Sequence, residues 1–218
     1  MVEKKYEAVL FDLDGTLLNT LEDLRDSVNY GLKVFGMPER SLEEIRHFVG
    51  NGVEKLIERA VIDGTKETVI KEVFEIFKEH YAIHCNDKTG LYPGISEMLA
   101  ALRERGFQMA IVSNKLQEGV DALQEQYFKD YLSVAIGARE GINKKPAPDT
   151  VLEALRILGV PRENAVYVGD SEVDIATAAN VGMDCITVEW GFRTRQEQED
   201  AGAVVFVEKP EELLRYVI

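Results

Sequence analysis

The chain has 218 residues, of which 45% are hydrophobic and 29% are charged. These proportions are typical of a soluble globular protein, and the length suits one main domain with an insertion. The formal net charge is −14, and a surface this acidic repels nucleic acid and anionic lipid, so we expect neither as a partner. No apolar run approaches the roughly 20 residues that span a bilayer. The start of the chain also lacks the pattern of a signal peptide, which favours a cytoplasmic protein that contacts no membrane.

The first structural element is a short apolar segment, Tyr6–Phe11, that ends directly at Asp12. Its sequence, YEAVLF, is rich in strand-forming residues and does not alternate with polar ones, as is typical of a parallel strand buried on both faces. We therefore predict a central strand here, with Asp12 at its carboxyl end.

Residues 17–87 differ from the rest, because their apolar residues recur with helical spacing and form no convincing strand. Breaks that contain glycine divide the segment into separate amphipathic helices. The expected helices are Leu21–Phe35, Leu42–Arg46, Val53–Val61 and Glu67–His84. About seventy residues are too many for a loop, so we predict a helical insertion. The alternative is that these helices simply cover one face of a sheet.

From Leu91 onward, short apolar runs alternate with helical patterns, which predicts a parallel sheet with helices on both faces. The expected strands are Phe107–Val112, Leu132–Ile136, Ala165–Val168, Cys185–Val188 and Val204–Val207. The expected helices are Ile95–Arg105, Gln117–Gln126, Thr150–Leu158, Val173–Val181 and Pro210–Tyr216. We therefore predict an α/β core domain of residues 1–16 and 88–218, and a helical domain of residues 17–87.

Polar side chains follow the ends of several of the predicted strands. In chain order they are Asp12, Asp14, Ser113, Asn114, Lys145, Asp170 and Asp174. In an open α/β sheet, ligands bind beyond the carboxyl ends of the strands. We therefore expect these side chains to converge on one site.

The acidic residues among them suggest a metal. Asp12 and Asp14 are two residues apart, so in an extended backbone their side chains leave on the same side. Two carboxylates at the end of a buried strand repel each other and lose solvation, which requires a nearby cation. Asp170 and Asp174 add carboxylate oxygen, a ligand set that suits Mg²⁺ better than Zn²⁺. Asp12 or Asp170 alone would be interpreted as a helix cap, but the two clusters together favour a metal site.

Four motifs of the chain resemble those of the haloacid dehalogenase superfamily of phosphohydrolases. FDLDGTLLNT is similar to the first motif, DxDGT after a buried strand, and IVSNK, KKPAPD and VGDSEVDIATAANVG are similar to the second, third and fourth. The resemblance covers essentially the whole chain, because the insertion also resembles the family's helical cap. It implies a Rossmann-like core and a Mg²⁺-dependent phosphatase that acts on a small phosphate ester through an aspartyl-phosphate.

The resemblance also implies catalytic and metal-binding roles. Asp12 would be the nucleophile, and Asp14 would protonate the leaving oxygen and later take a proton from water. Lys145 would complete the catalytic group. Asp12, the backbone carbonyl of Asp14 and Asp170 would hold Mg²⁺, and Asp174 would support these ligands from behind.

Further residues are expected to bind the substrate. Ser113, the Asn114 backbone N–H and Lys145 would bind the phosphoryl oxygens, because phosphoryl transfer depends mostly on alignment and charge neutralisation. Thr16, in the first motif, and Gly52, at a helix start in the insertion, would add substrate contacts. For Gly52, an ordinary interhelical turn is the alternative.

Other polar residues have plainer interpretations. Lys144 competes with Lys145 for the catalytic role, but Lys145 directly precedes the first proline of KPAP, as the motif's lysine does. Lys115 is expected to be a surface charge. His80 and His84 have the i,i+4 spacing that can hold zinc, but no third ligand stands at a matching position.

The insertion is expected to decide the substrate. FVGNGVEKLIERA resembles the cap segment of phosphoglycolate phosphatases, and VEWGF resembles their segment after the fourth motif, which implies a substrate like 2-phosphoglycolate. Asn19 departs from the family's pattern, because many members carry an acidic residue there. A β-phosphoglucomutase-like phosphomutase and a pyrophosphatase or nucleotidase of the same superfamily stay open. A phosphorylatable receiver module is disfavoured, since it needs neither Asp14 nor a cap. Monomer and homodimer are both compatible with the sequence.

Overall fold

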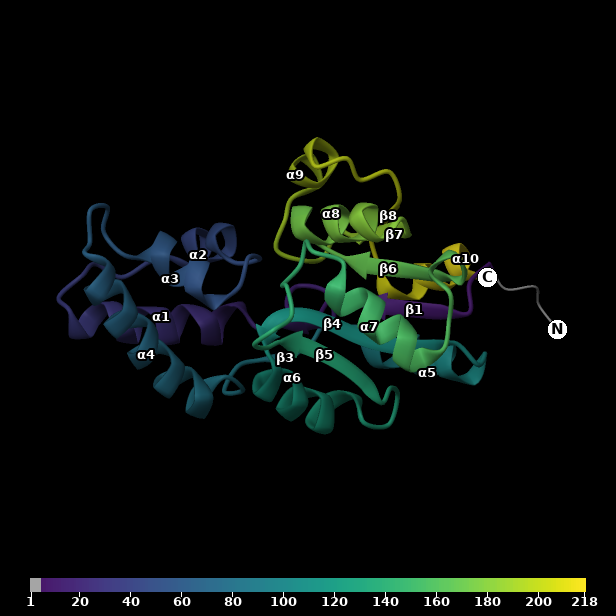
Figure 1. Cartoon of the computed structure of the whole chain (residues 1–218), viewed down its shortest axis with the longest axis horizontal. Helices are drawn as coiled ribbons and strands as arrows, with labels where there is room; N and C mark the ends of the chain where they lie inside the picture. The colour runs from purple at the N-terminus through teal and green to yellow at the C-terminus, as the bar shows by residue number, and fades with distance from the viewer. Residues whose placement is uncertain (1–4) are drawn as a thin grey trace. The chain divides into compact units, whose positions relative to one another are not determined.

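The structure is a computed structural model that describes residues 5–218 (Figure 1). Residues 1–4, on which part of the expected absence of a signal peptide rests, lie outside the described residues. The chain divides into two compact units. The core unit runs up to Leu18 and again from Leu91 to Ile218, and the helical unit is Asn19–Gly90. The domain boundaries predicted after residues 16 and 87 lie close to these unit boundaries, which fall after Leu18 and Gly90.

Within residues 5–218, the core unit has a sheet of 6 strands in the order β5-β4-β1-β6-β7-β8. The strands are β1 (Ala8–Phe11), β4 (Gln108–Leu116), β5 (Val134–Ala138), β6 (Ala165–Gly169), β7 (Asp184–Val188) and β8 (Phe206–Val207). Neighbouring strands are parallel throughout, and each strand corresponds to a predicted one. β4 runs past its predicted end, and its register with β5 shifts between Val112 and Leu116.

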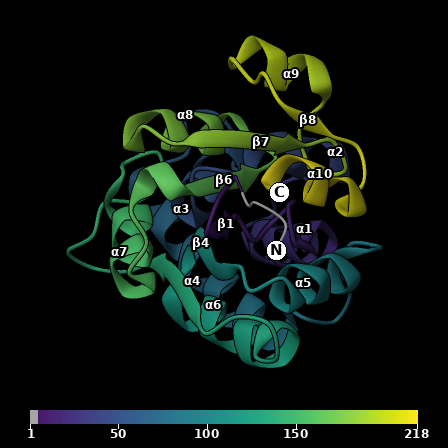
Figure 2. The ribbon, with the colours of Figure 1, turned by 90° about the vertical axis from the view of Figure 1, so that its right-hand side faces the viewer.

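Helices cover both faces of this sheet. They are α5 (Ile95–Glu104), α6 (Gln117–Leu123), α7 (Asp149–Leu158), α8 (Glu172–Val181), α9 (Arg195–Asp200) and α10 (Leu214–Val217). A π-helical turn follows α6 at Gln124–Phe128, and 3-10 turns lie at Arg162–Asn164 and Pro210–Leu213. Because successive strand residues point to opposite faces, Val9 and Phe11 join one hydrophobic cluster with α5, α6 and α10, and Ala8 and Leu10 join another with α7 and α8. Figure 2 shows α7 and α8 on one side of the strands and α5 and α10 on the other. The predicted α/β sheet is confirmed.

The helical unit consists of four helices and their connections. They are α1 (Leu21–Val34), α2 (Leu42–Phe48), α3 (Val53–Ala60) and α4 (Glu67–His84), and they match the predicted helices to within a residue or two. α1 and α4 approach closely at Gly31, where a Cβ would lie 3.2 Å from the carbonyl oxygen of Val73. Their facing sides bury Leu24, Val28 and Phe77, so the unit has an apolar core of its own.

Two short strands, β2 (Leu18–Asn19) and β3 (Gly90–Leu91), pair where the chain passes between the units. Asp23 in the first turn of α1 accepts hydrogen bonds from the backbone N–H groups of Lys88 (3.0 Å) and Thr89 (2.8 Å). The segments that enter and leave the helical unit are therefore joined by strand pairing and by the hydrogen bonds of Asp23. Neither strand was predicted, because two residues carry no periodic pattern. None of the helices in residues 5–218 is long and apolar enough to cross a membrane.

Candidate active site

The expected polar residues of the core unit gather at the carboxyl ends of its central strands. Asp12 directly follows β1, and its backbone N–H donates to Val168 of β6 (2.9 Å), so the strand pairing fixes its position. Asp170 directly follows β6, and Ser113 lies in the irregular end of β4. All three side chains are buried. The sheet therefore brings together residues that are far apart in the sequence.

Lys145 is the cation at the centre of this group. Its Nζ lies 2.8 Å from Asp12 Oδ1, 2.8 Å from Asp174 Oδ1 and 3.0 Å from the hydroxyl of Tyr167. Burial opposes its charge, but the carboxylates of Asp12 and Asp174 outweigh this effect and raise the pKa of Lys145 well above its usual value. Lys144, its neighbour, is only half-buried. The choice of Lys145 over Lys144 is supported by this geometry.

Within residues 5–218, one group of three acidic side chains is close enough to hold a metal ion: Asp12, Asp170 and Asp174, whose ligand oxygens lie within 4.8 Å of one another. Burial and then the charge of Asp174 raise the pKa of Asp12 well above its usual value. The same two causes, in the same order, raise the pKa of Asp170 to about 7. The positive charge of Lys145 alone therefore does not offset the burial and mutual repulsion of these carboxylates.

Hydrogen bonds orient the carboxylates of this group. Asp170 Oδ2 accepts the backbone N–H of Phe192 (2.7 Å), and Asp170 Oδ1 accepts the hydroxyl of Thr16 (3.2 Å). Asp174 Oδ2 accepts the backbone N–H (3.1 Å) and the hydroxyl (2.7 Å) of Ser171. Both oxygens of Asp174 are thus already bonded, one to Ser171 and one to Lys145. The contact of Thr16 is with a carboxylate, so the substrate contact expected of Thr16 stays a prediction.

Lys115 was predicted to be a surface charge, and this prediction is wrong. Its side chain is only 5% exposed, and its Nζ lies 3.0 Å from Asp14 Oδ1. The cause is the irregular end of β4, which continues through Lys115 rather than stopping at Val112. The one signal in the sequence was the adjacency of Lys115 to Ser113 and Asn114 at a strand end.

Ser113 and Asn114 connect this end of β4 to neighbouring segments. Ser113 Oγ accepts the backbone N–H of Lys115 (3.1 Å), and Asn114 Nδ2 donates to the backbone carbonyl of Lys145 (2.9 Å). Asn114 therefore holds the backbone that carries the central lysine. Gly52 belongs to the helical unit, where it precedes α3 with a φ of 89°. Its expected substrate contact stays a prediction.

The segment after β7 packs directly against Asp170. A Cβ on Gly191 would lie 2.3 Å from the Asp170 Cβ, so only glycine fits without displacement. Trp190 Nε1 donates to the backbone carbonyl of Thr16 (2.9 Å). The buried guanidinium of Arg193 lies 2.8 Å from a carboxylate oxygen of Glu172. In the sequence, VEWGF was recognised only as a segment that resembles the one after the family's fourth motif.

We expect Gly191→Ala to destabilise the core unit, because the new methyl group must push Asp170 or the segment after β7 aside. Overpacking of this kind costs about 1–3 kcal/mol, measurable by urea unfolding of the metal-free protein. Gly90→Ala is the matched control, since nothing lies within 4 Å of a Cβ at Gly90. Equal stability of Gly191→Ala and the wild type would contradict the close packing around Asp170.

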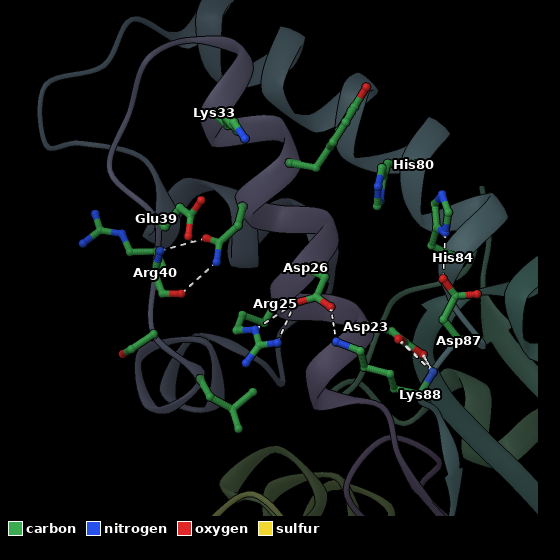
Figure 3. A pocket seen from close by; sticks show the side chains of 14 residues that line it. Asp23, Arg25, Asp26, Lys33, Glu39, Arg40, His80, His84, Asp87 and Lys88 are labelled. Atoms are coloured by element: carbon green, nitrogen blue, oxygen red, sulfur yellow. Dashed lines mark hydrogen bonds and ion pairs between the residues drawn. The ribbon is translucent and has the colours of Figure 1, made fainter.

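The helical unit contains a cavity of about 640 Å³ lined by residues of α1, α4 and the segments that follow them (Figure 3). Several of its charged side chains pair with one another. For example, Asp26 carboxylate oxygens lie 2.7 Å from Arg25 and 2.7 Å from Lys88. His80 and His84 stack with ring centroids 4.3 Å apart. Among the described residues, they belong to no group of three potential metal ligands. The cavity therefore has the character of a solvated, charge-balanced surface.

Comparison with known proteins relates most of the chain to one family. Residues 9–188 match the family model described as haloacid dehalogenase-like hydrolase. A phosphoglycolate phosphatase from Aquifex aeolicus is 35% identical over 185 residues, covering 84% of this chain and 85% of the relative. A phosphoglycolate phosphatase from Nitrosococcus oceani is 34% identical over 207 residues, covering 91% of this chain and 92% of the relative.

Solved structures give the same relationship. A protein from Lactobacillus delbrueckii subsp. bulgaricus, provisionally named a phosphoglycolate phosphatase, matches with a TM-score of 0.94 at 38% identity, covering 98% of this chain and 99% of its own. CbbY from Rhodobacter sphaeroides, solved in complex with phosphate, matches with a TM-score of 0.78 at 29% identity, covering 95% of this chain and 96% of its own.

Proposed function

The chain belongs to the haloacid dehalogenase-like hydrolases, as its motifs predicted, and we propose that it is a magnesium-dependent phosphatase for a small phosphorylated metabolite. The observation that carries this proposal is the buried group of Asp12, Asp170 and Asp174, with Lys145 2.8 Å from Asp12. Relatives named phosphoglycolate phosphatase support a substrate like 2-phosphoglycolate. Membership of a hydrolase family argues against a non-catalytic receiver module.

The charge balance of the site supports a divalent cation. Its charged contacts involve four aspartates and two lysines, which are Asp12, Asp14, Asp170, Asp174, Lys115 and Lys145. With all four carboxyl groups ionised, four negative charges less two positive ones leave a net charge of −2, which one divalent cation neutralises. The donors are hard carboxylate oxygens, which suit Mg²⁺. We assign the metal to the carboxylates of Asp12 and Asp170 and the backbone carbonyl of Asp14, with Asp174 orienting the group.

The proposed reaction has two steps at one carboxylate. Asp12 attacks phosphorus, so that a carboxylate–phosphorus bond forms while the bond to the leaving oxygen breaks and Asp14 protonates that oxygen. A water molecule then attacks the aspartyl-phosphate and gives its proton to Asp14, which releases phosphate and restores Asp12. Mg²⁺ supplies charge neutralisation for the phosphoryl oxygens.

The other residues hold the reacting groups in place. Ser113, the Asn114 backbone N–H and Lys145 bind the phosphoryl oxygens in this proposal, since donors aimed at developing charge stabilise the transition state most. Thr16 orients Asp170, in keeping with its 3.2 Å hydrogen bond. Gly52 offers a backbone N–H to the carboxylate of the substrate from the helical unit, which acts as the cap.

A panel of phosphate esters tests the proposed function. With Mg²⁺, we expect phosphate release to be most efficient, by kcat/KM, from 2-phosphoglycolate in a panel that also contains pyrophosphate, nucleoside monophosphates and hexose phosphates. No release from any ester contradicts the phosphatase. Interconversion of hexose phosphates with little free phosphate points to a phosphomutase instead. The cytoplasmic location and the choice between monomer and homodimer stay predictions.

Magnesium is expected to stabilise the folded protein, because it binds the folded site and relieves repulsion among buried carboxylates. Binding of this kind adds about 2.7 kcal/mol at a concentration one hundred times Kd, measured as a rise of Tm with Mg²⁺ concentration. Asp170→Asn removes one buried negative charge. We therefore expect this variant to be more stable than the wild type in EDTA and to gain less from Mg²⁺. An equal Mg²⁺ gain in both proteins contradicts the assignment of Asp170 as a ligand.

A further inference from the structure

The backbone of Asp170 is held by a side chain that comes from much later in the chain. Gln198 of α9 is 0% exposed, and its Nε2 lies 2.8 Å from the carbonyl oxygen of Asp170 and 2.8 Å from that of Val188. Carbonyl oxygens only accept hydrogen bonds, so the amide nitrogen must be the group that faces them. Both N–H groups of the amide are thus committed to two backbone carbonyls.

These two carbonyls lie where the pairing of β6 and β7 ends. The register runs from Val166 opposite Asp184 to Gly169 opposite Thr187. Asp170 and Val188 are the next residues on the two strands. Buried carbonyl groups at such a point need partners, and Gln198 supplies them from α9. The amide therefore continues the connection between the strands for one further step, at the position of the proposed metal ligand.

The same side chain also has an acceptor without a hydrogen bond. Gln198 Oε1 is buried and accepts no hydrogen bond from the described residues. An unpaired buried acceptor is destabilising, and an apolar side chain that merely filled the space would avoid the loss. The role of Gln198 must therefore lie in what its two N–H groups hold.

The segment before α9 holds the side chain of Asp170 as Gln198 holds its backbone. The backbone N–H of Phe192 lies 2.7 Å from Asp170 Oδ2, and Gly191 allows the segment to pass against the Asp170 Cβ. We propose that Gln198 is a positioning residue for the metal-binding carboxylate of Asp170. This inference rests on the proposed function, because it assumes that Asp170 binds Mg²⁺.

The test measures binding of Mg²⁺ alone. Gln198→Met keeps the length of the side chain and removes both N–H donors. Loss of a group that orients a metal ligand typically costs 10–100-fold in affinity, so we expect the Mg²⁺ concentration for half-saturation to rise roughly tenfold or more. Calorimetry measures this directly. Trp190, the one tryptophan of the chain, gives a second signal by fluorescence, since its indole N–H bonds to Thr16 beside the site.

Enzyme kinetics separate a loss of metal affinity from a loss of catalysis. With Mg²⁺ at saturation, kcat and the substrate KM of Gln198→Met are expected to return close to the wild-type values, because the defect lies in metal affinity. Gln196→Met is the matched control. It lies on the same helix, is exposed, and bonds only to the Asp200 side chain among the contacts described (3.0 Å), and we expect its half-saturation to be unchanged.

Gln198→Asn keeps the amide on a shorter side chain that cannot reach both carbonyls, so an intermediate loss of Mg²⁺ affinity is expected. If Gln198→Met does not fold, the Mg²⁺ half-saturation of Gln198→Asn tests the proposal in its place. If the Gln198 variant that folds binds Mg²⁺ with the half-saturation of the wild type, the inference is overturned, even if the Tm of the variant is lower. Gln198 then only anchors α9. A wild-type protein that neither binds Mg²⁺ nor releases phosphate overturns the proposed function instead.

Discussion

Asp12→Asn is expected to abolish turnover, with kcat lower by roughly 10⁵-fold or more, because the variant loses the nucleophile itself. An amide oxygen has too little nucleophilic character to displace an ester oxygen from phosphorus. The measurement is steady-state phosphate release with Mg²⁺ at saturation, using the best ester of the substrate panel. Asp12 is placed for this role by the end of β1 and by Lys145, 2.8 Å from its carboxylate.

The control for Asp12→Asn is Asp130→Asn, which makes the same chemical change on the surface and should leave kcat unchanged. The Asp12 variant itself should fold, because burial and the charge of Asp174 already raise the pKa of Asp12 and disfavour its ionised form. Urea unfolding in EDTA checks this point. A folded Asp12→Asn protein with kcat near the wild type would end the nucleophile assignment.

Asp14→Asn is expected to lower kcat by roughly 10²–10⁴-fold, the usual contribution of general acid–base catalysis. The Mg²⁺ half-saturation should change much less than kcat, because the metal is assigned to the backbone carbonyl of Asp14 and not to its side chain. Lys115, whose Nζ lies 3.0 Å from the Asp14 carboxylate, loses an ion pair in this variant. Lys115→Met, which breaks the same pair and leaves the carboxylate, separates the two effects.

The leaving group distinguishes the two steps in which Asp14 takes part. p-Nitrophenolate leaves without needing a proton, so formation of the aspartyl-phosphate from p-nitrophenyl phosphate should survive in Asp14→Asn. Its hydrolysis still needs Asp14 as the base and should be slow. Stopped-flow absorbance is therefore expected to show a burst of p-nitrophenol close to one per site, followed by slow turnover. A Mg²⁺ affinity that falls more than kcat, with no burst, would remove Asp14 from the acid–base role.

The carboxyl ends of the strands were the part of the site that could be predicted. Asp12 directly follows a predicted buried strand, and Asp170 follows another after Gly169. A parallel sheet aligns such strand ends on one edge. The structure places both within one group of ligand oxygens, together with Asp174. For Lys145, the motif with its following proline was enough to choose it over Lys144, and the contact with Asp12 agrees.

Residues whose burial depends on irregular backbone, or on a helix without an apolar pattern, could not be predicted. Lys115 is buried because β4 continues past a shift of register, and no apolar pattern marks that shift. α9, with the sequence RQEQED, has no apolar stripe, so neither the helix nor the buried side of Gln198 appears in the periodicity. The pairing of β2 with β3 depends on the fold of both units and involves two residues on each side.

The proposed mechanism requires that Asp12 becomes covalently phosphorylated. The direct test mixes the enzyme with Mg²⁺ and its best substrate, quenches with acid within one turnover, and examines the proteolytic peptides by mass spectrometry. We predict one added phosphoryl group on the peptide that contains Asp12, with fragmentation that places it on Asp12 and not on Asp14 or Asp170. The adduct should appear before free phosphate and decay as phosphate is released. If neither the wild type nor Asp14→Asn, quenched during active turnover, carries a phosphoryl group on Asp12, then Asp12 is not the nucleophile.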